Sequence, residues 1–239
     1  MSMLEALKLA VVKLPLVRQA AAALGIGPHT FRSSEHYWEQ RYAHGGTSGR
    51  GSYGPLAEWK AKFISEFLMQ EGVTSAIEFG CGDGNQLSLV PYRNYVGLDV
   101  SRVAIRTCAK RFSDDSAKSF FLYHPEGFAD NLGVFRAELT LSLDVVYHLV
   151  EQATFEAYMR HLFGAARRYV IIYSSDTDAP SPDRHVRHRQ FTAWVAQHLG
   201  EWRLRTRVAN QYPLGDGPGE GSFADFYVFE LAVNAGAPA

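Results

Sequence analysis

A short apolar segment that runs directly into closely spaced glycines is the feature that most constrains the fold. Residues Ser75–Phe79 are followed by Gly80-Cys81-Gly82-Asp83-Gly84. Glycine has no Cβ, so its backbone can turn tightly and can approach a ligand closely. A strand that ends in such a turn is typical of α/β proteins that bind a nucleotide or a cofactor there. The turn is neither Gly-x-Gly-x-x-Gly nor a P-loop, and a purely structural turn is the alternative.

Strand and helix patterns alternate around this turn. Helical patterns cover residues 56–71, 85–89, 102–112, 154–166 and 190–199, with Thr154 as a cap; strand patterns cover 75–79, 95–100, 119–123, 139–145, 169–174, 203–208 and 223–231. Such alternation predicts a doubly wound, mostly parallel seven-stranded sheet of the α/β class, with a Rossmann-like arrangement. No helix separates the last two strands, which predicts an antiparallel hairpin at one edge. Residues 56–239 are the predicted main domain.

Residues 1–55 are predicted to form an amphipathic helix and a lid segment. Residues 1–25 are apolar on one side, carry Lys8, Lys13 and Arg18 on the other, and are interrupted by Pro15. They either pack on the domain or contact a partner protein or the inner face of a membrane. Residues 35–54 combine aromatic side chains with a Gly/Ser-rich stretch, which suits a lid over a cofactor, although a surface helix with a mobile loop is the alternative.

Composition narrows the classes of function. The chain has 239 residues and a net charge of −1, which argues against nucleic acid as a partner because such proteins usually carry a basic surplus. Its two cysteines, Cys81 and Cys108, form no CxxC pair, which predicts reduced thiols in a cytoplasmic protein. No ligand spacing for a metal occurs, so we expect metal independence. No apolar run of membrane-spanning length occurs either.

An acidic residue follows the glycine turn at a spacing that is typical of cofactor sites. Asp99 ends the next predicted strand, in Val96-Gly97-Leu98-Asp99-Val100. An acid about 20 residues beyond the turn, at a strand tip, can accept hydrogen bonds from both ribose hydroxyls. Alone, it could equally stabilise the start of the following helix. The combination of turn and acid is what indicates a cofactor site.

Three segments together resemble the class I S-adenosylmethionine (SAM) dependent methyltransferases. Glu78-Phe79-Gly80-Cys81-Gly82-Asp83-Gly84 resembles their first motif, Leu98-Asp99-Val100-Ser101 the second, and residues 141–149 the fourth, so that the resemblance covers about residues 56–175. It implies SAM as the cofactor. It also implies that Gly80, Cys81 and Gly82 lie against the methionine part, Glu78 reaches its amino group, Asp99 holds the ribose and Val100 packs on the adenine. The family's acid after the third strand has no clear counterpart in Tyr123-His124-Pro125-Glu126.

Candidate catalytic residues follow the fourth predicted strand. Methyl transfer from a sulfonium is an in-line displacement, so the protein mainly positions the acceptor, and a hydroxyl acceptor benefits from a general base. His148 is the candidate base and Asp144 the second catalytic candidate, at the sheet edge where such folds bind ligands. A histidine bonded within the fold and a helix-capping acid are the respective alternatives. From the lid, Tyr37, Arg41 and Tyr42 are expected to contact the cofactor or the acceptor.

A basic loop suggests the character of the acceptor. Arg184-His185-Val186-Arg187-His188-Arg189 follows the fifth predicted strand and can bind a phosphate or a carboxylate, unless it is an ordinary solvated loop. The predicted substrate-binding residues are Tyr147, Ser175, Arg184, His185 and His188. The sequence therefore predicts methyl transfer to a small molecule, to a hydroxyl of a sugar, a nucleotide-linked glycan or a related anionic metabolite, as in polysaccharide biosynthesis.

Other functions remain open at this point. A secondary-metabolite N- or O-methyltransferase fits the same motifs, and so does a non-catalytic interaction protein that keeps the fold. An NAD-dependent oxidoreductase is disfavoured because its Gly-x-Gly-x-x-Gly turn and its Tyr-x-x-x-Lys pair do not occur. A methyltransferase acting on base amino groups is disfavoured because Asp144-Val145-Val146-Tyr147 lacks the Pro-Pro pair of that motif.

Overall fold

The computed structural model describes residues 31–215 and 221–232. The chain divides into two compact units, Met1–Arg32 and Ser33–Ala239. The predicted amphipathic segment, residues 1–25, lies outside the described residues. The larger unit begins at Ser33 rather than at residue 56, so the predicted lid segment belongs to the same compact unit as the sheet.

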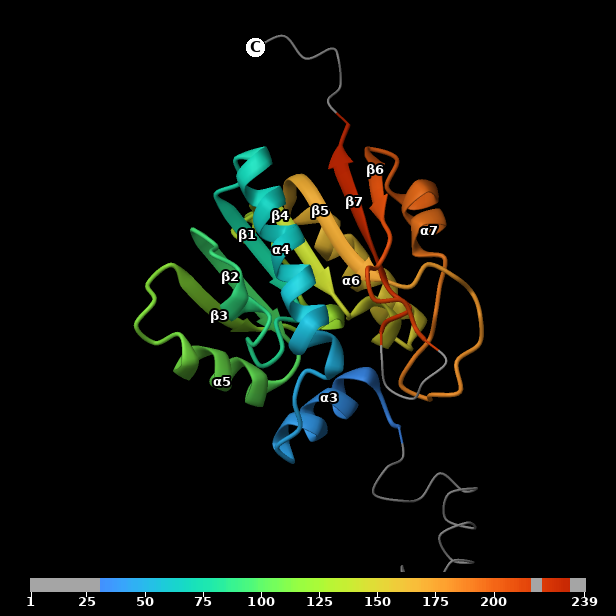
Figure 1. Ribbon diagram of the computed structural model, residues 1–239, viewed down its shortest axis with the longest axis horizontal. Helices are drawn as coiled ribbons and strands as arrows, with labels where there is room; N and C mark the ends of the chain where they lie inside the picture. The colour runs from blue at the N-terminus through green and yellow to red at the C-terminus, as the bar shows by residue number, and fades with distance from the viewer. Residues whose placement is uncertain (1–30, 216–220, 233–239) are drawn as a thin grey trace, which may run out of the picture. The chain divides into compact units, whose positions relative to one another are not determined.

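One sheet of seven strands organises the larger unit (Figure 1), as the sequence predicted. Its order is β3-β2-β1-β4-β5-β7-β6. The strands are β1 (Ser75–Phe79), β2 (Asn94–Asp99), β3 (Lys118–Leu122), β4 (Ala137–Leu143), β5 (Ala166–Ser174), β6 (Trp202–Val208) and β7 (Asp225–Leu231). The first five run parallel, and β7 pairs antiparallel with both β5 and β6. The predicted antiparallel edge hairpin is confirmed, with β7 inserted between β5 and β6.

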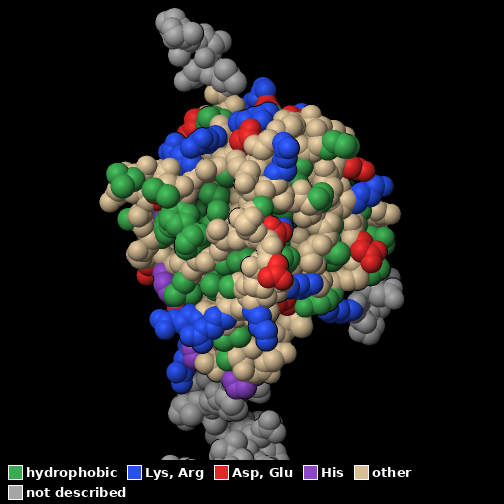
Figure 2. Space-filling model, turned by 90° about the vertical axis from the view of Figure 1, so that its left-hand side faces the viewer, with side chains coloured by type: hydrophobic (Ala, Val, Ile, Leu, Met, Phe, Trp, Pro, Cys, Tyr) green, Lys and Arg blue, Asp and Glu red, His purple; other side chains and the backbone are tan. Residues whose placement is uncertain are grey.

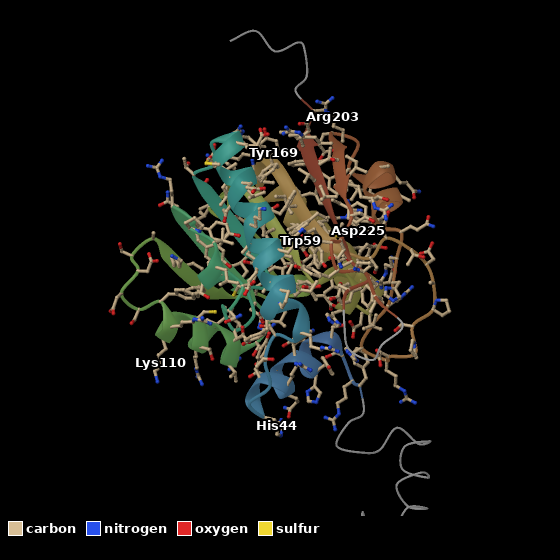
Figure 3. All side chains as sticks on the ribbon, viewed as in Figure 1. His44, Trp59, Lys110, Tyr169, Arg203 and Asp225 are labelled. Atoms are coloured by element: carbon tan, nitrogen blue, oxygen red, sulfur yellow. The ribbon has the colours of Figure 1, made fainter. Side chains whose placement is uncertain are left out.

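Helices cover both faces of the sheet. They are α3 (Ser34–Ala43), α4 (Gly54–Glu71), α5 (Arg102–Arg111), α6 (Gln152–Gly164) and α7 (Phe191–His198). One buried cluster joins α4 and α5 to the sheet, and the other joins α6 and α7 to its opposite face. Trp59 of α4 contacts the rings of Tyr173 and Phe226, while Lys110 of α5 points outward (Figure 3). Helix α4 ends at Gly72, whose φ of 63° closes the last turn in the left-handed region.

Two predicted elements differ from the structure. The segment expected to be a helix at 85–89 forms only a 3-10 turn, Leu87–Leu89. Gly84, with φ 76°, precedes it and Pro91 follows, so too few residues remain for a stable α-helix. Thr154 does not cap α6, because Glu151 occupies that position and the Thr154 hydroxyl donates to Glu126 instead.

The outer strand β3 leaves apolar side chains in contact with solvent. Phe121 and Leu122 are more than a third exposed, and Leu132 and Val134 in the loop that follows are more exposed still. Figure 2 shows the side of the molecule on which β3 lies, with apolar side chains gathered there. No described strand pairs with the outer edge of β3.

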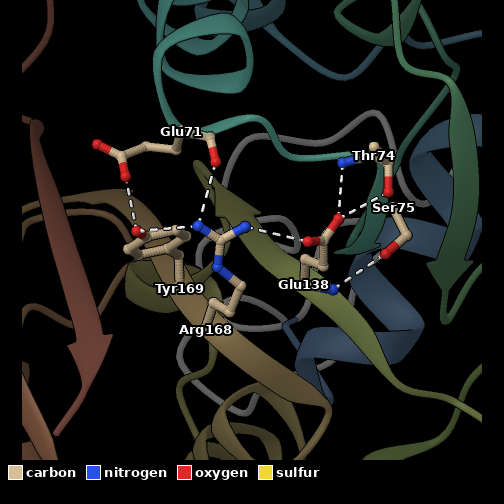
Figure 4. Close-up of polar contacts among 6 residues, drawn as sticks. All are labelled: Glu71, Thr74, Ser75, Glu138, Arg168 and Tyr169. Atoms are coloured by element: carbon tan, nitrogen blue, oxygen red, sulfur yellow. Dashed lines mark hydrogen bonds and ion pairs between the residues drawn. The ribbon is translucent and has the colours of Figure 1, made fainter. Parts of the chain in front are cut away.

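The amino ends of the central strands are tied together by polar side chains (Figure 4). Glu138 of β4 accepts hydrogen bonds from the backbone nitrogen and the hydroxyl of Thr74, at 2.7 and 2.8 Å. Its other oxygen pairs with Arg168 of β5 at 3.0 Å, and Arg168 also donates to the carbonyl of Glu71. This network fixes the edge of the sheet that lies opposite the ligand-binding edge.

We predict that Glu138→Gln lowers the free energy of unfolding by about 1 kcal/mol at pH 7, because a charge-assisted acceptor is lost at a partly screened site. The hydrogen bonds from Thr74 and the pair with Arg168 hold the pKa of Glu138 below its usual value. The stability that depends on this lowered pKa is present above about pH 4.5 and is lost as the pH falls. The difference in unfolding free energy between the wild type and Glu138→Gln, measured by urea unfolding, should be smaller at pH 3.5 than at pH 7.

The matched control is Glu66→Gln in α4, whose exposed carboxylate lies 4.0 Å from Lys62. It should change the unfolding free energy by less than about 0.5 kcal/mol. Equal effects of the two substitutions would contradict the assigned role of Glu138.

Candidate active site

The glycine turn forms the floor of a cavity at the carboxyl edge of the parallel strands. Gly80 and Gly82 line this cavity, which measures about 250 Å³, and have φ values of 86° and 58°. The backbone nitrogen of Gly80 donates to the carbonyl of Leu98 at 2.7 Å, which ties the turn to β2. A Cβ on Gly80 would collide with Val145, and one on Gly82 with Ser48. Both conformation and space therefore require glycine at these positions.

Asp99 lies beside this turn, as the spacing predicted. Its Oδ2 accepts from the backbone nitrogen of Gly82 at 2.9 Å, and its Oδ1 from that of Ser101 at 2.8 Å. Burial raises the pKa of Asp99 to about 6, against the opposing effect of these two hydrogen bonds. Each carboxylate oxygen has a second lone pair, so Asp99 can still accept two hydrogen bonds from a ligand. Val100, next to it, also lines the cavity.

Two further acceptors, Glu78 and Gln86, line the cavity. Glu78 is buried and accepts the hydroxyl of Tyr95 at 2.6 Å, and burial raises its pKa to about 7. Gln86 donates its amide to the carbonyl of Ala57 at 3.1 Å, while its Oε1 is buried without a partner among the described residues. An unpaired buried acceptor is costly, so this oxygen suits a ligand donor. Gln86 was not singled out from the sequence, since a glutamine two residues beyond the turn carries no signal of its own.

The predicted lid segment closes the cavity from the side of α3, which lies below the carboxyl ends of the strands in Figure 1, with His44 at its far end in Figure 3. Ser34 bonds both oxygens of Glu151 at the start of α6, at 3.0 and 2.7 Å. At the other end, Ser101 donates its hydroxyl to Glu39 at 2.6 Å. These bonds fasten α3 to α6 on one side and to α5 on the other. Trp38 of α3 lines the cavity.

The loop after α3 is clasped to the glycine turn. The backbone nitrogen of Ser48 donates to the Asp83 carboxylate at 2.8 Å, and the backbone nitrogen of Asp83 donates to the Ser48 hydroxyl at 2.9 Å. Tyr53 adds a bond to the same carboxylate at 2.9 Å, and the Tyr42 hydroxyl bonds Ser48 at 3.0 Å. We call the reciprocal bonds of Ser48 and Asp83 the lid clasp.

The three residues predicted from the lid have different surroundings. Tyr42 lines the cavity. Tyr37 instead stacks on His185, with ring centroids 4.4 Å apart. Arg41 donates its Nε to the carbonyl of Thr47 at 2.6 Å and does not line the cavity. Of the three, only Tyr42 is placed to touch a ligand in this structure.

Asp144 lines the cavity with both carboxylate oxygens engaged. Lys60 of α4, which is fully buried, bonds Oδ2 at 2.5 Å, and the Tyr147 hydroxyl donates to Oδ1 at 2.8 Å. Among the described residues other than glycine, only Asp144 has a positive φ, 60°. Tyr147 is buried behind Asp144 rather than in the cavity wall, so its predicted contact with a substrate would be indirect. Lys60 was not singled out from the sequence, because nothing in its helix pattern marks the lysine as buried.

His148 lines the same cavity and has a defined tautomer. Its Nδ1 lies 2.9 Å from the backbone carbonyl of His185, so that Nδ1 donates the proton and Nε2 keeps a free lone pair. The ring packs edge-on against Trp38 and is stacked with His185. Burial lowers the pKa of His148 to about 4, which keeps the ring neutral at pH 7. Its Nε2 can therefore accept a proton, although the burial that keeps the ring neutral also makes it a weaker base than a solvent-exposed histidine.

The remaining predicted residues lie away from the cavity. Ser175 and His188 bond each other at 2.6 Å, and Arg184 lines a separate groove together with His188. Cys81 is buried beside Cys108, whose thiol contacts the carbonyl of Gly82 at 3.2 Å, and the Cys81 side chain does not line the cavity. The structure therefore brings together the glycine turn, Asp99, Asp144 and His148, but not the Arg/His loop as a whole.

The described part of the chain contains no helix with both the length and the apolar character of a membrane span. It also contains no group of three or more His, Cys, Asp or Glu side chains placed to hold a metal ion.

We predict that Lys60→Met lowers the free energy of unfolding by about 3–5 kcal/mol, because it leaves the Asp144 carboxylate without its buried partner. The double variant Lys60→Met/Asp144→Asn should recover a large part of this loss. Lys62→Met, two residues along the same helix at an exposed position, is the control and should cost less than about 0.5 kcal/mol. Urea unfolding measures all three, and additive losses in the double variant would contradict a direct pair.

Solved structures of methyltransferases share this fold. The N-methyltransferase NodS from Bradyrhizobium japonicum WM9, in complex with S-adenosyl-L-homocysteine (SAH), is 16% identical with a TM-score of 0.64, over 83% of this chain and 98% of that one. The methyltransferase domain of bacterial CtHen1 is 19% identical (TM-score 0.57, 74% and 98% covered). Magnesium protoporphyrin IX methyltransferase from Synechocystis PCC 6803 is 13% identical, with a TM-score of 0.56 over 84% of this chain and 96% of that one. No protein-family model and no curated protein sequence matches the chain. The chain therefore has the Rossmann-like fold of SAM-dependent methyltransferases.

Proposed function

We propose that this protein is a SAM-dependent methyltransferase that acts on a small molecule, at a hydroxyl of a sugar, a nucleotide-linked glycan or a related anionic metabolite. One observation carries the proposal. A single cavity at the carboxyl edge of the sheet is walled by the glycine turn, Glu78 and Asp99 on one side and by the lid segment on the other. Open α/β sheets bind their ligands at this edge.

The residues of the cavity fit SAM group by group. Glu78 and the unpaired Oε1 of Gln86 suit the ammonium of the methionine part. Asp99 has a free lone pair on each oxygen for the two ribose hydroxyls. Val100 and Tyr123 offer apolar surface to the adenine. When bound, SAM supplies an electrophilic methyl group on a positively charged sulfur.

His148 supports an oxygen acceptor. A hydroxyl must lose its proton as the new bond to carbon forms, and a neutral imidazole with a free Nε2 can take that proton. Asp144 is less suited to this task, because its carboxylate forms an ion pair with the buried ammonium of Lys60 and also accepts a hydrogen bond from Tyr147. We assign Asp144 a role in the shape and charge of the cavity. We assign His148 the role of accepting the proton of the hydroxyl.

The fold alone does not select the acceptor. The similar structures include an N-methyltransferase, a magnesium protoporphyrin IX methyltransferase and a small RNA methyltransferase. The net charge of −1 favours a small molecule over RNA here. A secondary-metabolite N- or O-methyltransferase is the second candidate, because a neutral His148 can accept a proton from either kind of acceptor. Cytoplasmic location and peripheral contact through residues 1–25 stay predictions.

We predict that the protein binds SAH with a dissociation constant well below about 1 mM and that Asp99→Asn weakens binding at least about tenfold, because a charged acceptor for the ribose is lost. Isothermal titration calorimetry measures both. Asp114→Asn, at an exposed position in the loop after α5, should bind SAH as the wild type does. Absence of SAH binding by the wild type would leave only a non-catalytic role for the fold.

The same titration should depend on pH. Asp99 and Glu78, with pKa values of about 6 and about 7, are the acceptors and act as such when ionised. Affinity for SAH should therefore rise from pH 5.5 to pH 8, with release of protons on binding near pH 7. A flat profile would argue against both carboxylates as ligands.

We also predict that His148→Ala abolishes most methyl transfer while SAH affinity stays within about twofold, since the ring acts on the acceptor rather than on the cofactor. Transfer of labelled methyl from SAM into a metabolite extract gives the readout, with a loss of about 100-fold expected. His198→Ala, on an exposed site of α7, is the control. Undiminished labelling by His148→Ala would remove the histidine from the reaction.

A further inference from the structure

A second hollow lies behind one wall of the methyl-transfer cavity. It has a volume of about 760 Å³ and is bounded by the loop at residues 178–190 and by α6 and α7. The segment 149–155 separates the two spaces and contributes alternate side chains to each. Leu149, Glu151 and Thr154 line the cavity, whereas Val150, Gln152 and Phe155 line the second hollow, which we call the arginine groove.

Three arginines line the arginine groove without a carboxylate partner. Arg184, Arg187 and Arg189 form no ion pair within the described ranges 31–215 and 221–232. Arg189 is only 8% exposed, and it donates to the carbonyls of Leu149 and Val150 at 2.6 and 2.9 Å. Carbonyl oxygens satisfy N–H groups but do not neutralise a charge. Burial lowers the pKa of Arg189 to about 10; Arg187 acts in the same direction, and the carboxylates of Glu151, Asp178 and Glu156 oppose it.

Hydrogen-bond donors without a partner line this groove. Arg187 uses one donor on the carbonyl of Val150 at 3.0 Å, and no hydrogen bond of Arg184 occurs in the described structure. The indole nitrogen of Trp194 is buried without an acceptor. Two aspartates also line the groove. Asp178 accepts from the backbone of Gln190, the Asp183 carboxylate forms no hydrogen bond in the described structure, and the three arginines outnumber the two aspartates. A surface with surplus donors and surplus positive charge fits a ligand that offers only acceptor oxygens and negative charge.

We propose that the arginine groove binds a phosphoryl group. Planar guanidinium groups pair with phosphate oxygens in a bidentate manner, and a tetrahedral phosphoryl group can meet several arginines at once. Arg187 and Arg189 both hold the turn at residues 147–150, which carries His148. A phosphoryl group bound in the groove therefore lies on the other side of segment 149–155 from the cavity that His148 lines.

The sequence predicted anion binding by the whole loop 184–189 and named Arg184, His185 and His188 as substrate-binding residues. Arg184, Arg187, His188 and Arg189 line the groove, and His185 does not. The ring of His185 instead stacks between Tyr37 and His148. Burial lowers the pKa of His188, so its ring adds no charge to the groove at neutral pH.

Binding of pyrophosphate tests the proposal and does not require the natural ligand to be identified. Calorimetry at low salt should give saturable binding of pyrophosphate to the full-length protein at sub-millimolar concentration. Arg184→Ala/Arg187→Ala should weaken it at least about tenfold, and Arg184→Ala alone should weaken it several-fold. The single variant removes a side chain without structural hydrogen bonds, so it keeps the test valid if the double variant folds poorly.

A matched variant controls for net charge. Arg102→Ala/Arg106→Ala removes two exposed arginines of α5 and should bind pyrophosphate as the wild type does. Equal weakening in both double variants, or no binding by the wild type at millimolar pyrophosphate, overturns the proposal. SAH binding, measured on the same samples, separates the two hypotheses. If SAH binds and pyrophosphate does not, the groove proposal fails alone; if pyrophosphate binds and SAH does not, the methyltransferase proposal fails alone.

Discussion

The buried carboxylate of Asp99 is the contact on which the candidate site depends. It holds the backbone nitrogens of Gly82 and Ser101, and so it joins the turn after β1 to the end of β2 and the start of α5. A carboxylate is costly to bury, and hydrogen bonds from two backbone nitrogens offset only part of that cost. A ligand that supplies further donors would offset more of it. The same residue thus shapes the cavity and keeps acceptor capacity for the hydroxyl groups of a ligand.

The parts predicted correctly from the sequence depend on neighbours along the chain. Ser75–Phe79 is apolar and ends in glycines, so the local pattern alone determines a strand and a turn, and β1 has these bounds. The acid at the tip of the next strand follows from the same short-range logic. The prediction of a helix at 85–89 was wrong, because the residues that favour a helix start are present but too few residues remain before Pro91 to form one. The fold was therefore predictable largely from local signals repeated in order.

The parts missed depend on contacts between distant segments. Lys60 reaches Asp144 across 84 positions of the chain, and Gln86 reaches Ala57 across 29. In the sequence, a buried lysine in a helix or a buried glutamine in a loop looks the same as one on the surface, and only the packing distinguishes them. The Arg/His loop was recognised as basic, but the direction of each side chain could not follow from composition. His185 joined the aromatic wall beside His148, while Arg189 turned toward the groove.

The lid clasp has a consequence for the time that a cofactor stays bound. Ser48 and Asp83 exchange hydrogen bonds between the lid loop and the glycine turn, so the two sides of the cavity are joined to each other as well as to any ligand. A molecule leaving past this loop must wait until both bonds open together. Residence time is then governed by the opening rate of the protein, and substitutions at Ser48 would alter the dissociation rate more than the contacts that recognise the ligand.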